Sequence, residues 1–330
     1  MPRVSIVLPV YNAAPFLVDA MASMVTQTME DWEMIAVDDG STDESPAILA
    51  WFAKIDPRVR VLRQENQGIV AALNHGCREA RAPWICRMDA DDLSHPERLA
   101  RQSLFAESNP ACVAFGGALV EIDPRSRPLG FRGLPTSHAA IVDRLQAGKP
   151  GLYHPTTWIL KEAFSAVGGY RPEYQWVEDH DLWLRLSQIG ELGNLDRTIL
   201  YYRLHAGSVC ANRRTRQSEL LAELLGRPRP AERNAVPSHP AHFGGPGKWS
   251  RAALRGGHPG VAFQHLSDVF RQQGCSTYAL RTAFEFSIRF PSSVFKRLAM
   301  GPCSIPSFNE WQDCWSQSRS APHHRTVEAA

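Results

Sequence analysis

The chain opens with an apolar stretch, Val4-Ser5-Ile6-Val7-Leu8-Pro9-Val10. Such a strand has no polar face to turn toward water, so it predicts a central strand of a parallel sheet that is covered on both sides. A helical pattern follows from about Pro15. A second apolar strand, Glu33–Val37, then ends in Asp38-Asp39-Gly40.

The alternation of strand and helix continues along the chain. We expect a strand near Val59–Leu62, a helix over Ile69–Ala80, and a strand over Trp84–Met88 that ends at Asp89-Ala90-Asp91-Asp92. A fifth strand is expected near Cys112–Val120. Repeats at this spacing predict an α/β fold with a Rossmann-like, mostly parallel sheet flanked by helices. Ligands of such a sheet bind beyond the carboxyl ends of its strands, where these acidic residues lie.

Local patterns predict the remaining elements of the first two thirds of the chain. Ser41-Thr42-Asp43-Glu44 matches a capping box at the start of a helix. Residues 121–150 are predicted to be loop with one short helix. Helical patterns follow at Lys161–Val167 and Asp179–Gln188, before a strand-like segment, Arg197–Leu204.

Proline and glycine are frequent in residues 226–250, which is the composition of a linker. We therefore predict three parts: a domain over 1–210, a linker-like segment over 211–259, and a smaller helical region over 260–330 with a frayed tail. Within the last part, helices are expected over Val261–Gln272 and Thr277–Phe290.

The composition is that of a globular protein. Of 330 residues, 44% are hydrophobic and 21% are charged, which excludes collagen, a coiled coil and a mostly disordered chain. No stretch approaches the roughly 18 to 20 apolar residues of a spanning helix, and the first residues lack the order of a signal peptide. The seven cysteines are odd in number and scattered without a CxxC pair, which favours a reducing compartment. We therefore expect a cytoplasmic location.

Asp89-Ala90-Asp91 is the strongest single chemical signal. On an extended turn, residues i and i+2 project to the same side, so these carboxylates can share a divalent cation and present it to a diphosphate. A solvated acidic cap is the alternative for such a short pattern. Asp92 is expected either to support the site or to cap the element that follows.

The other candidate motifs are weaker when each is taken alone. Asp38 and Asp39 are placed to bind a ribose or a base, although an Asp-Gly turn explains them as well. No GxGxxG motif follows the first strand, so a dehydrogenase loses its main support. Asp179 and Asp181 lie in the first turn of a helix, where the dipole favours anions, and capping is a serious alternative. His205 at the end of a strand is uninformative by itself.

Together these blocks resemble the family 2 glycosyltransferases of GT-A fold. The opening strand through Asn12, the Asp38–Asp43 turn, the Met88–Asp92 acidic motif and the Glu178-Asp179 pair occur in the order of that family. So do Asn66-Gln67-Gly68 with Ala72–Gly76, and the segment Tyr202–Ser208. The resemblance covers about 205 residues. It implies inverting transfer of a sugar from a nucleoside diphosphate, most simply a UDP-sugar, in cell-surface or exopolysaccharide assembly.

The resemblance also implies residue roles. Asp179 is expected to be the general base, and Mg²⁺ or Mn²⁺ is expected at Asp91 and His205, with Asp89 near the ribose or the metal. The residues expected to bind the nucleotide sugar are Pro9, Tyr11, Asp38, Asp39, Asn66, Gly68 and Asp89. On the side of the acceptor, a glycan or a lipid-linked saccharide, the candidates are His154, Trp176 and Glu178; packing is at least as good an explanation for Trp176. No nucleic acid partner is expected.

The carboxyl-terminal 120 residues lie outside the resemblance. They lack a Gln-x-x-Arg-Trp motif, so transfer of a single sugar is favoured over polymerisation. Lys and Arg number 16 against 8 Asp and Glu in residues 206–330, but 20 against 26 in residues 1–205. This basic excess, with aromatic residues between Phe284 and Arg297, fits peripheral contact with the anionic inner face of a membrane. A helical core with a solvated basic face fits slightly better.

Three other functions are weighed against this one. A sugar-nucleotide nucleotidyltransferase needs a glycine-rich basic loop after the first strand, and residues 9–15 have neither feature. A glycoside hydrolase has two carboxylates but no use for a nucleotide turn. A non-catalytic nucleotide-sugar binding module is the third alternative, and it applies if the acidic residues are not assembled into one site.

Overall fold

The computed structural model describes residues 1–205 and 214–228, together with eight single positions between Trp249 and Asp268. The described strands are β1 (Val4–Val10), β2 (Trp32–Asp39), β3 (Val59–Gln64), β4 (Trp84–Arg87), β5 (Leu93–Ser94), β6 (Cys112–Ile122), β7 (Pro128–Arg132), β8 (Trp158–Leu160) and β9 (Glu191–Arg203). The helices are α1 (Ala14–Val25), α2 (Ser45–Ile55), α3 (Ile69–Glu79), α4 (Arg98–Ser108), α5 (His138–Gln146), α6 (Lys161–Ala166), α7 (Glu178–Leu186) and α9 (Arg214–Leu224), with 3-10 turns η1 (His154–Thr156) and η2 (Pro172–Tyr174).

The described strands form one sheet, and the half of it that is built from the first four strands is parallel. Its order is β3-β2-β1-β4-β8-β6-β9-β5, with β7 paired to β6. Strands β3, β2, β1 and β4 are parallel neighbours, as the alternation of apolar strands and helices predicted. Their carboxyl ends therefore meet at one edge of the sheet, and Asp38, Asp39 and Asp89 lie there.

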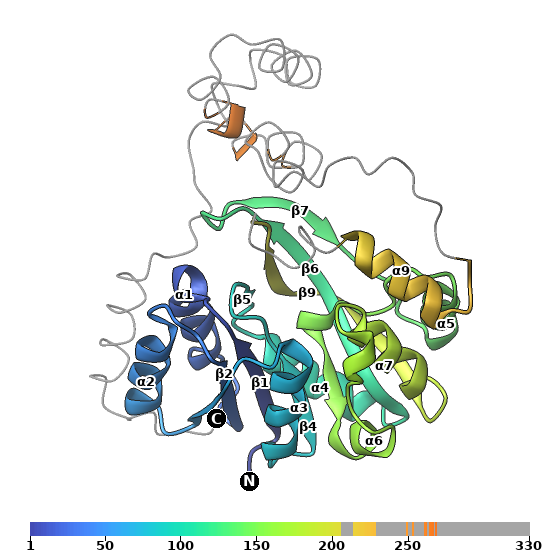
Figure 1. Ribbon diagram of the computed structural model, residues 1–330, viewed down its shortest axis with the longest axis horizontal. Coiled ribbons are helices and arrows are strands. Elements are labelled where there is room, and N and C mark those ends of the chain that lie inside the picture. The colour runs from blue at the N-terminus through green and yellow to red at the C-terminus, as the bar shows by residue number, and fades with distance from the viewer. Residues whose placement is uncertain are drawn as a thin grey trace, which may run out of the picture.

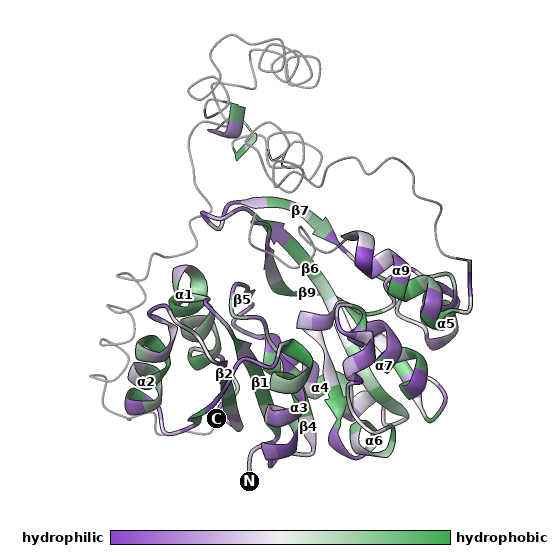
Figure 2. Ribbon diagram, in the orientation of Figure 1, coloured by the Kyte–Doolittle hydropathy of each residue, from purple (hydrophilic) through white to green (hydrophobic). Residues whose placement is uncertain are grey.

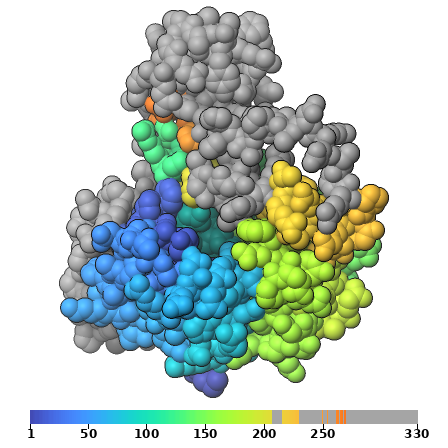
Figure 3. Space-filling model, viewed as in Figure 1, coloured from blue at the N-terminus to red at the C-terminus, as the bar shows by residue number. Residues whose placement is uncertain are grey.

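The second half of the sheet is mixed. Strand β8 is antiparallel to β4 and β6, and the long strands β6 and β9 run parallel to each other with several register shifts. In Figure 1 these two strands cross between the blue amino-terminal elements and the yellow-green elements around α6 and α7. The face in Figure 3 is hollowed between those two groups of elements. In the sequence, the acidic cluster after β4 lies between these two groups of elements.

Apolar side chains cover both faces of the sheet. On β1, Ile6 and Leu8 pack in a core with α1, α2 and α4, whereas Val7 packs on the other side with α3 and α7. This alternation follows from the two-residue period of a strand. Figure 2 shows hydrophobic colour along the central strands and on the helix faces that meet them. The prediction from the opening stretch, a strand buried on both sides, is confirmed.

The structure corrects several local predictions. The capping box at Ser41–Glu44 is wrong: the Asp43 carboxylate accepts the Ser45 N–H at 2.9 Å, and the Ser41 hydroxyl accepts the Asn12 N–H at 3.0 Å. Residues 121–150, predicted as loop with one helix, also contain β7. Strand β9 begins at Glu191, six residues before the predicted segment. Short strands β5 and β8 were not predicted, because two or three residues leave no period in the sequence.

The predicted three-part division stays a prediction. Helix α9 lies within the segment expected to be linker-like, and Gly148 after α5 lies beside Leu221 of α9 and Leu225 just after it. The predicted helix over Thr277–Phe290 and the aromatic and basic residues up to Arg297 lie outside the described residues, as does most of 206–330. Among the helices that the structure describes, none is both long enough and apolar enough to cross a membrane.

Gly76 lets α3 lie close against the sheet, which generates a stability prediction. A Cβ there would lie 2.6 Å from Val7 Cγ1 and 3.1 Å from Val37 Cγ2. Alanine gains about 1 kcal/mol of helix propensity over glycine, but overpacking a buried interface costs roughly 1–3 kcal/mol. We expect Gly76→Ala to lower the free energy of urea unfolding, and Val7→Ala to relieve most of that loss in a double-mutant cycle. A more stable Gly76→Ala variant contradicts this close packing.

Candidate active site

The acidic motif after β4 meets the end of β9. Carboxylate oxygens of Asp89, Asp91 and Asp92 all lie within 4.8 Å of one another. His205, which follows β9, places Nε2 at 2.8 Å from Asp91 Oδ2, although 114 residues separate the two in sequence. The fold thus assembles Asp91 and His205, the two residues that sequence reasoning assigned to a metal.

Asp92 supports the idea that this cluster suits a cation. Its side chain is fully buried, and Oδ1 accepts the Arg203 N–H at 2.8 Å. Its Oδ2 is buried and has no hydrogen-bond partner among the described residues. Burial, together with the neighbouring Asp91 and Asp89 charges, raises the pKa of Asp92 well above its usual value. Carboxylates are the hard oxygen ligands that Mg²⁺ and Mn²⁺ prefer, and His205 beside Asp91 adds a nitrogen ligand of the kind that transition metals bind. The residues present therefore fit a divalent cation.

Asp89 is held differently from Asp91. The guanidinium of Arg87, the last residue of β4, contacts both carboxylate oxygens of Asp89. Burial raises the pKa of Asp89 to about 6, while Arg87 opposes that shift. Because Arg87 already satisfies this carboxylate, Asp89 is less free than Asp91 to bind a cation.

The Glu178-Asp179 pair opens α7. Glu178 is 6% exposed, and its Oε2 accepts the Trp176 N–H at 2.6 Å. Asp179 is half-buried, and its Oδ1 accepts the His180 N–H at 2.8 Å. Burial raises the pKa of Asp179, and burial with the Asp179 charge raises the pKa of Glu178 to about 7. The two neighbouring acids therefore face different surroundings.

Asp181, one of the acids that the sequence left as a candidate base, is a structural residue. Its Oδ2 accepts hydrogen bonds from Arg185 Nε at 3.0 Å and Nη2 at 2.5 Å. Arg171 lies 3.6 Å from its other oxygen. Its two oxygens are therefore occupied by buried ion pairs and do not face an open site.

Arg87 connects the two acidic groups, and sequence reasoning gave it no role. Burial raises the pKa of Asp89, Glu178 and Asp179, and the positive charge of Arg87 opposes each of these shifts. The acidic motif and the start of α7 therefore both interact electrostatically with the same buried cation. The available signal was a charged residue in an apolar strand immediately before the acidic motif.

The wall expected to hold the nucleotide is assembled around Asp39. Its carboxylate accepts hydrogen bonds from Gln64 Nε2, the Gln67 N–H and the Gly68 N–H at 2.8–2.9 Å. A carboxylate has about four acceptor positions, so roughly one is left for a ligand. Asp39 thus also positions the loop that carries Asn66 and Gly68.

Two glycines allow that loop to approach closely. Gly40 has φ +74°, and a Cβ there would lie 2.9 Å from the backbone nitrogen of Asn66. Gly68 has φ +87°, and a Cβ there would meet the side-chain amide of Gln175 at 3.1 Å. On the other side of the turn, the Asp38 carboxylate accepts the Ser41 N–H at 2.9 Å.

The remaining predicted residues lie in two environments. Tyr11 is 53% exposed just beyond β1, whereas Pro9 lies within that strand. His154 is buried, with Nε2 at 2.7 Å from the Tyr170 hydroxyl and Nδ1 at 4.0 Å from Glu178 Oε1. Burial, with a smaller effect of the Arg87 charge, lowers the pKa of His154 well below its usual value, so the imidazole is neutral.

Trp176 has a left-handed backbone, with φ +81°, immediately before α7. The Glu178 carboxylate holds its N–H, and its carbonyl accepts a hydrogen bond from Gln217 Nε2 of α9 at 3.0 Å. A residue without glycine's freedom persists in this conformation only when its surroundings hold it there. Trp176 is therefore held through both its backbone N–H and its backbone carbonyl.

Comparisons with known proteins show the family of this chain. A family model described as Glycosyl transferase family 2 matches residues 5–168. The amylovoran biosynthesis glycosyltransferase AmsE of Erwinia amylovora is 30% identical over 214 residues, which are 64% of this chain and 79% of that protein. An uncharacterized glycosyltransferase of Haemophilus influenzae is 31% identical over 207 residues, 62% of this chain and 76% of that protein.

Solved structures show the same fold. S. aureus TarS 1-349 in complex with UDP has a TM-score of 0.54 at 16% identity, covering 100% of this chain and 94% of that chain. The mannosyltransferase PcManGT from Pyrobaculum calidifontis, in complex with GDP-Man and Mn²⁺, has a TM-score of 0.52 at 15% identity, covering 97% and 87%. By its sequence relatives, its motifs and its GT-A fold, the chain belongs to glycosyltransferase family 2.

Proposed function

We propose that the protein transfers a single sugar, with inversion, from a nucleoside-diphosphate sugar to a hydroxyl of a glycan or lipid-linked saccharide. The observation that carries this proposal is the pairing of Asp91 with His205 beside Asp89 and Asp92. Solved relatives of the same fold in complex with UDP and with GDP-Man support the donor class. The name of the relative AmsE supports a place in exopolysaccharide assembly.

In this proposal the metal residues are Asp91 and His205, with Asp89 or Asp92 completing the set. A bound Mg²⁺ or Mn²⁺ supplies positive charge to the diphosphate as it leaves. Arg87 orients Asp89 through two contacts, which keeps that carboxylate near the ribose side of the donor. The nucleotide lies against Tyr11 and against the loop that Asp39 holds.

Asp179 is the proposed base. It accepts the proton of the acceptor hydroxyl as that oxygen bonds to the anomeric carbon and the bond to the diphosphate breaks. Of the three acids in this turn it is the one that is half-buried, whereas Asp181 is paired with Arg185 and Arg171. Burial raises the pKa of Asp179, which makes its carboxylate a stronger proton acceptor, while the His180 and Arg87 charges oppose that shift.

Glu178 acts through structure in this proposal. Its carboxylate holds the Trp176 N–H and faces the neutral His154, so it positions the segment expected to border the acceptor.

We place the reaction in the cytoplasm, with peripheral contact to the inner face of a membrane through the basic carboxyl-terminal region when the acceptor is lipid-linked.

Removing the Asp91 carboxylate should remove the metal site. We expect Asp91→Ala to abolish transfer and Mn²⁺-dependent UDP binding, measured by calorimetry, while the fold is kept. His205→Ala should weaken the Mn²⁺ dependence less, because an imidazole contributes less than a carboxylate to a hard cation. Asp196→Ala, at an exposed position of β9, is the matched control. Full activity of Asp91→Ala contradicts the assignment.

Replacing the proposed base should affect chemistry rather than donor binding. Losing a positioned base typically costs about 10²- to 10⁴-fold in rate, so we expect Asp179→Asn to lower kcat by about that factor with an unchanged Kd for UDP. Asp181→Asn should instead lower the urea midpoint, because it breaks a buried ion pair. If Asp181→Asn is the inactive variant and Asp179→Asn keeps its turnover, the base is wrongly assigned.

The buried Glu178 makes stability depend on pH. Its pKa is raised by burial to about 7, so the folded protein holds a proton there that the unfolded chain releases near its ordinary, lower value. Stability from this group is therefore present at low pH and is lost as pH rises to about 7. We expect Glu178→Gln to gain thermal stability over wild type at pH 8 and to gain much less at pH 5. A gain that is independent of pH contradicts the raised pKa.

A further inference from the structure

Arg203, the last residue of β9, contacts the acidic motif with its backbone and its side chain. It is 1% exposed. Its N–H donates to Asp92 Oδ1 at 2.8 Å, and its Nε donates to the carbonyl oxygen of Asp91 at 2.8 Å. His205 follows two residues later and contacts the Asp91 carboxylate. Arg203 therefore binds the Asp91 backbone and the Asp92 carboxylate, directly beside the Asp91–His205 pair.

The same guanidinium group shares an aromatic neighbour with His205. Its central carbon lies 4.8 Å from the ring of Phe16 in α1, and that ring lies 4.8 Å from the His205 ring. Arg203 Nη2 also lies 3.7 Å from Asp19 Oδ2 of the same helix. Displacing Arg203 would thus remove a support that the Asp91 backbone and the His205 ring have in common.

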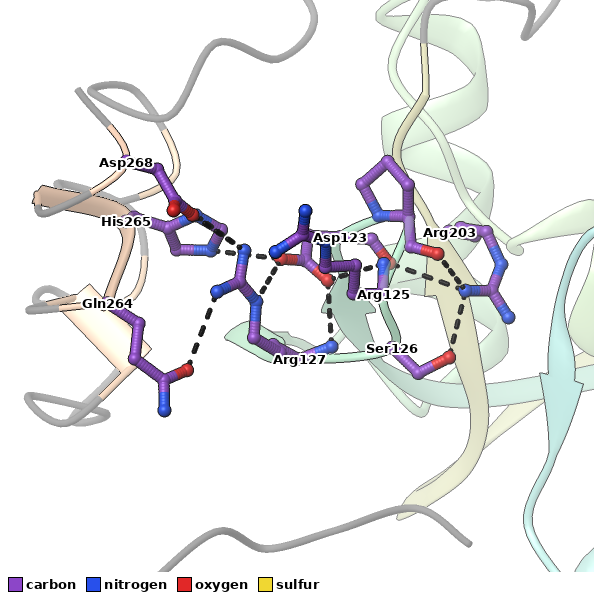
Figure 4. A network of polar contacts seen from close by, with 9 residues as sticks. Asp123, Arg125, Ser126, Arg127, Arg203, Gln264, His265 and Asp268 are labelled. Carbon is purple, nitrogen blue, oxygen red and sulfur yellow. Dashed lines mark hydrogen bonds and ion pairs between the residues drawn. The ribbon is translucent and has the colours of Figure 1, made fainter. Parts of the chain in front are cut away.

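The far side of Arg203 is bound by the turn of residues 123–127, which joins β6 to β7. Nη1 donates to the Pro124 carbonyl at 3.0 Å and to the Ser126 hydroxyl at 2.8 Å (Figure 4). The Asp123 carboxylate shapes this turn by accepting the N–H groups of Arg125 at 2.8 Å and Arg127 at 2.9 Å. The turn therefore presents its oxygens to Arg203 in a fixed arrangement.

Described carboxyl-terminal positions dock on the other face of this turn. His265 Nε2 lies 3.1 Å from Asp123 Oδ2, and both side chains are fully buried. Arg127 Nη2 lies 3.1 Å from His265 Nδ1 and 3.5 Å from Asp268 Oδ2, as Figure 4 shows. Leu129 of β7 is buried in an apolar cluster whose other buried members are Ala253, Ala262 and Leu266. A continuous set of contacts thus runs from this region through the turn to the metal motif.

We propose that Arg203 is a positioning residue of the metal motif, held in place by the 123–127 turn and by the carboxyl-terminal positions docked on it. The inference rests on the proposed function, because it requires that Asp91 and His205 hold a divalent cation. A guanidinium group donates in several fixed directions, which a lysine ammonium does not reproduce. Groups that orient metal ligands from behind typically change metal affinity by about 10- to 100-fold when they are removed.

The test measures Mn²⁺ binding to the full chain in the presence of UDP, by calorimetry, beside the urea midpoint of each variant. Arg203→Lys keeps the positive charge but loses the branched guanidinium group and its separate N–H donors, so we expect the Kd for Mn²⁺ to rise about tenfold or more. Excess Mn²⁺ should restore kcat, which a merely structural defect would not allow. Arg127→Gln should raise the Kd in the same direction by a smaller factor, since it loosens the turn from the other side.

The matched control is Arg101→Lys, because Arg101 Nη1 donates to the Thr198 carbonyl of the same strand at 2.9 Å, away from the acidic motif. Its Kd for Mn²⁺ should equal that of wild type. If wild type binds Mn²⁺ no better than Asp91→Ala does, the proposed metal site itself fails. If wild type binds and Arg203→Lys binds equally well, only this inference is overturned. Should Arg203→Lys not fold, an unchanged Kd in Arg127→Gln overturns it.

Discussion

A group of closely spaced carboxylates held beside buried arginines is the feature on which the rest of this structure depends. Asp89, Asp91 and Asp92 gather within 4.8 Å after β4, and the buried Asp92 carboxylate is costly unless its surroundings compensate for it. Three buried arginines lie around this cluster. Arg87 binds the Asp89 carboxylate, Arg203 binds the Asp92 carboxylate and the Asp91 carbonyl, and the fully buried Arg98 donates to the Arg87 carbonyl at 2.8 Å. These arginines oppose, without cancelling, the rise in the pKa of Asp89 and Asp92 that burial and the neighbouring carboxylates cause.

The two sides of the site are joined by another set of buried polar contacts. The Asn74 side chain in α3 donates to the Tyr170 carbonyl at 2.8 Å and accepts its N–H at 3.0 Å. The Tyr170 hydroxyl lies 2.7 Å from His154, which faces Glu178. One amide therefore links the helix behind the nucleotide wall to the start of α7. These contacts join the proposed donor-side and acceptor-side elements across the mixed sheet.

Neighbouring acids in α7 have different hydrogen-bond partners. Successive residues of a helix point about 100° apart, so Glu178 and Asp179 cannot face the same groups. Glu178 turns inward to the Trp176 N–H, and Asp181 turns to Arg185. Asp179 keeps partial exposure. The first turn of this helix holds three acids, which is more than capping needs, and each of them has a different partner.

The sequence by itself determined the parallel half of the sheet. The apolar composition of residues 4–10 and 33–37 predicts buried strands, and their spacing leaves room for a helix between parallel neighbours. It also determined the acidic motif and its expected partner His205, because the sequence motifs that contain them occur in the order of the family and can be recognised without a structure. It could not determine the pairing of β8, β6 and β9, since short or irregular strands pair over long separations without a local signal. The roles of Arg87 and Arg203, and the different surroundings of Glu178, Asp179 and Asp181, were decided by tertiary structure alone. A charged side chain takes its function from the groups that folding brings within a few ångströms of it.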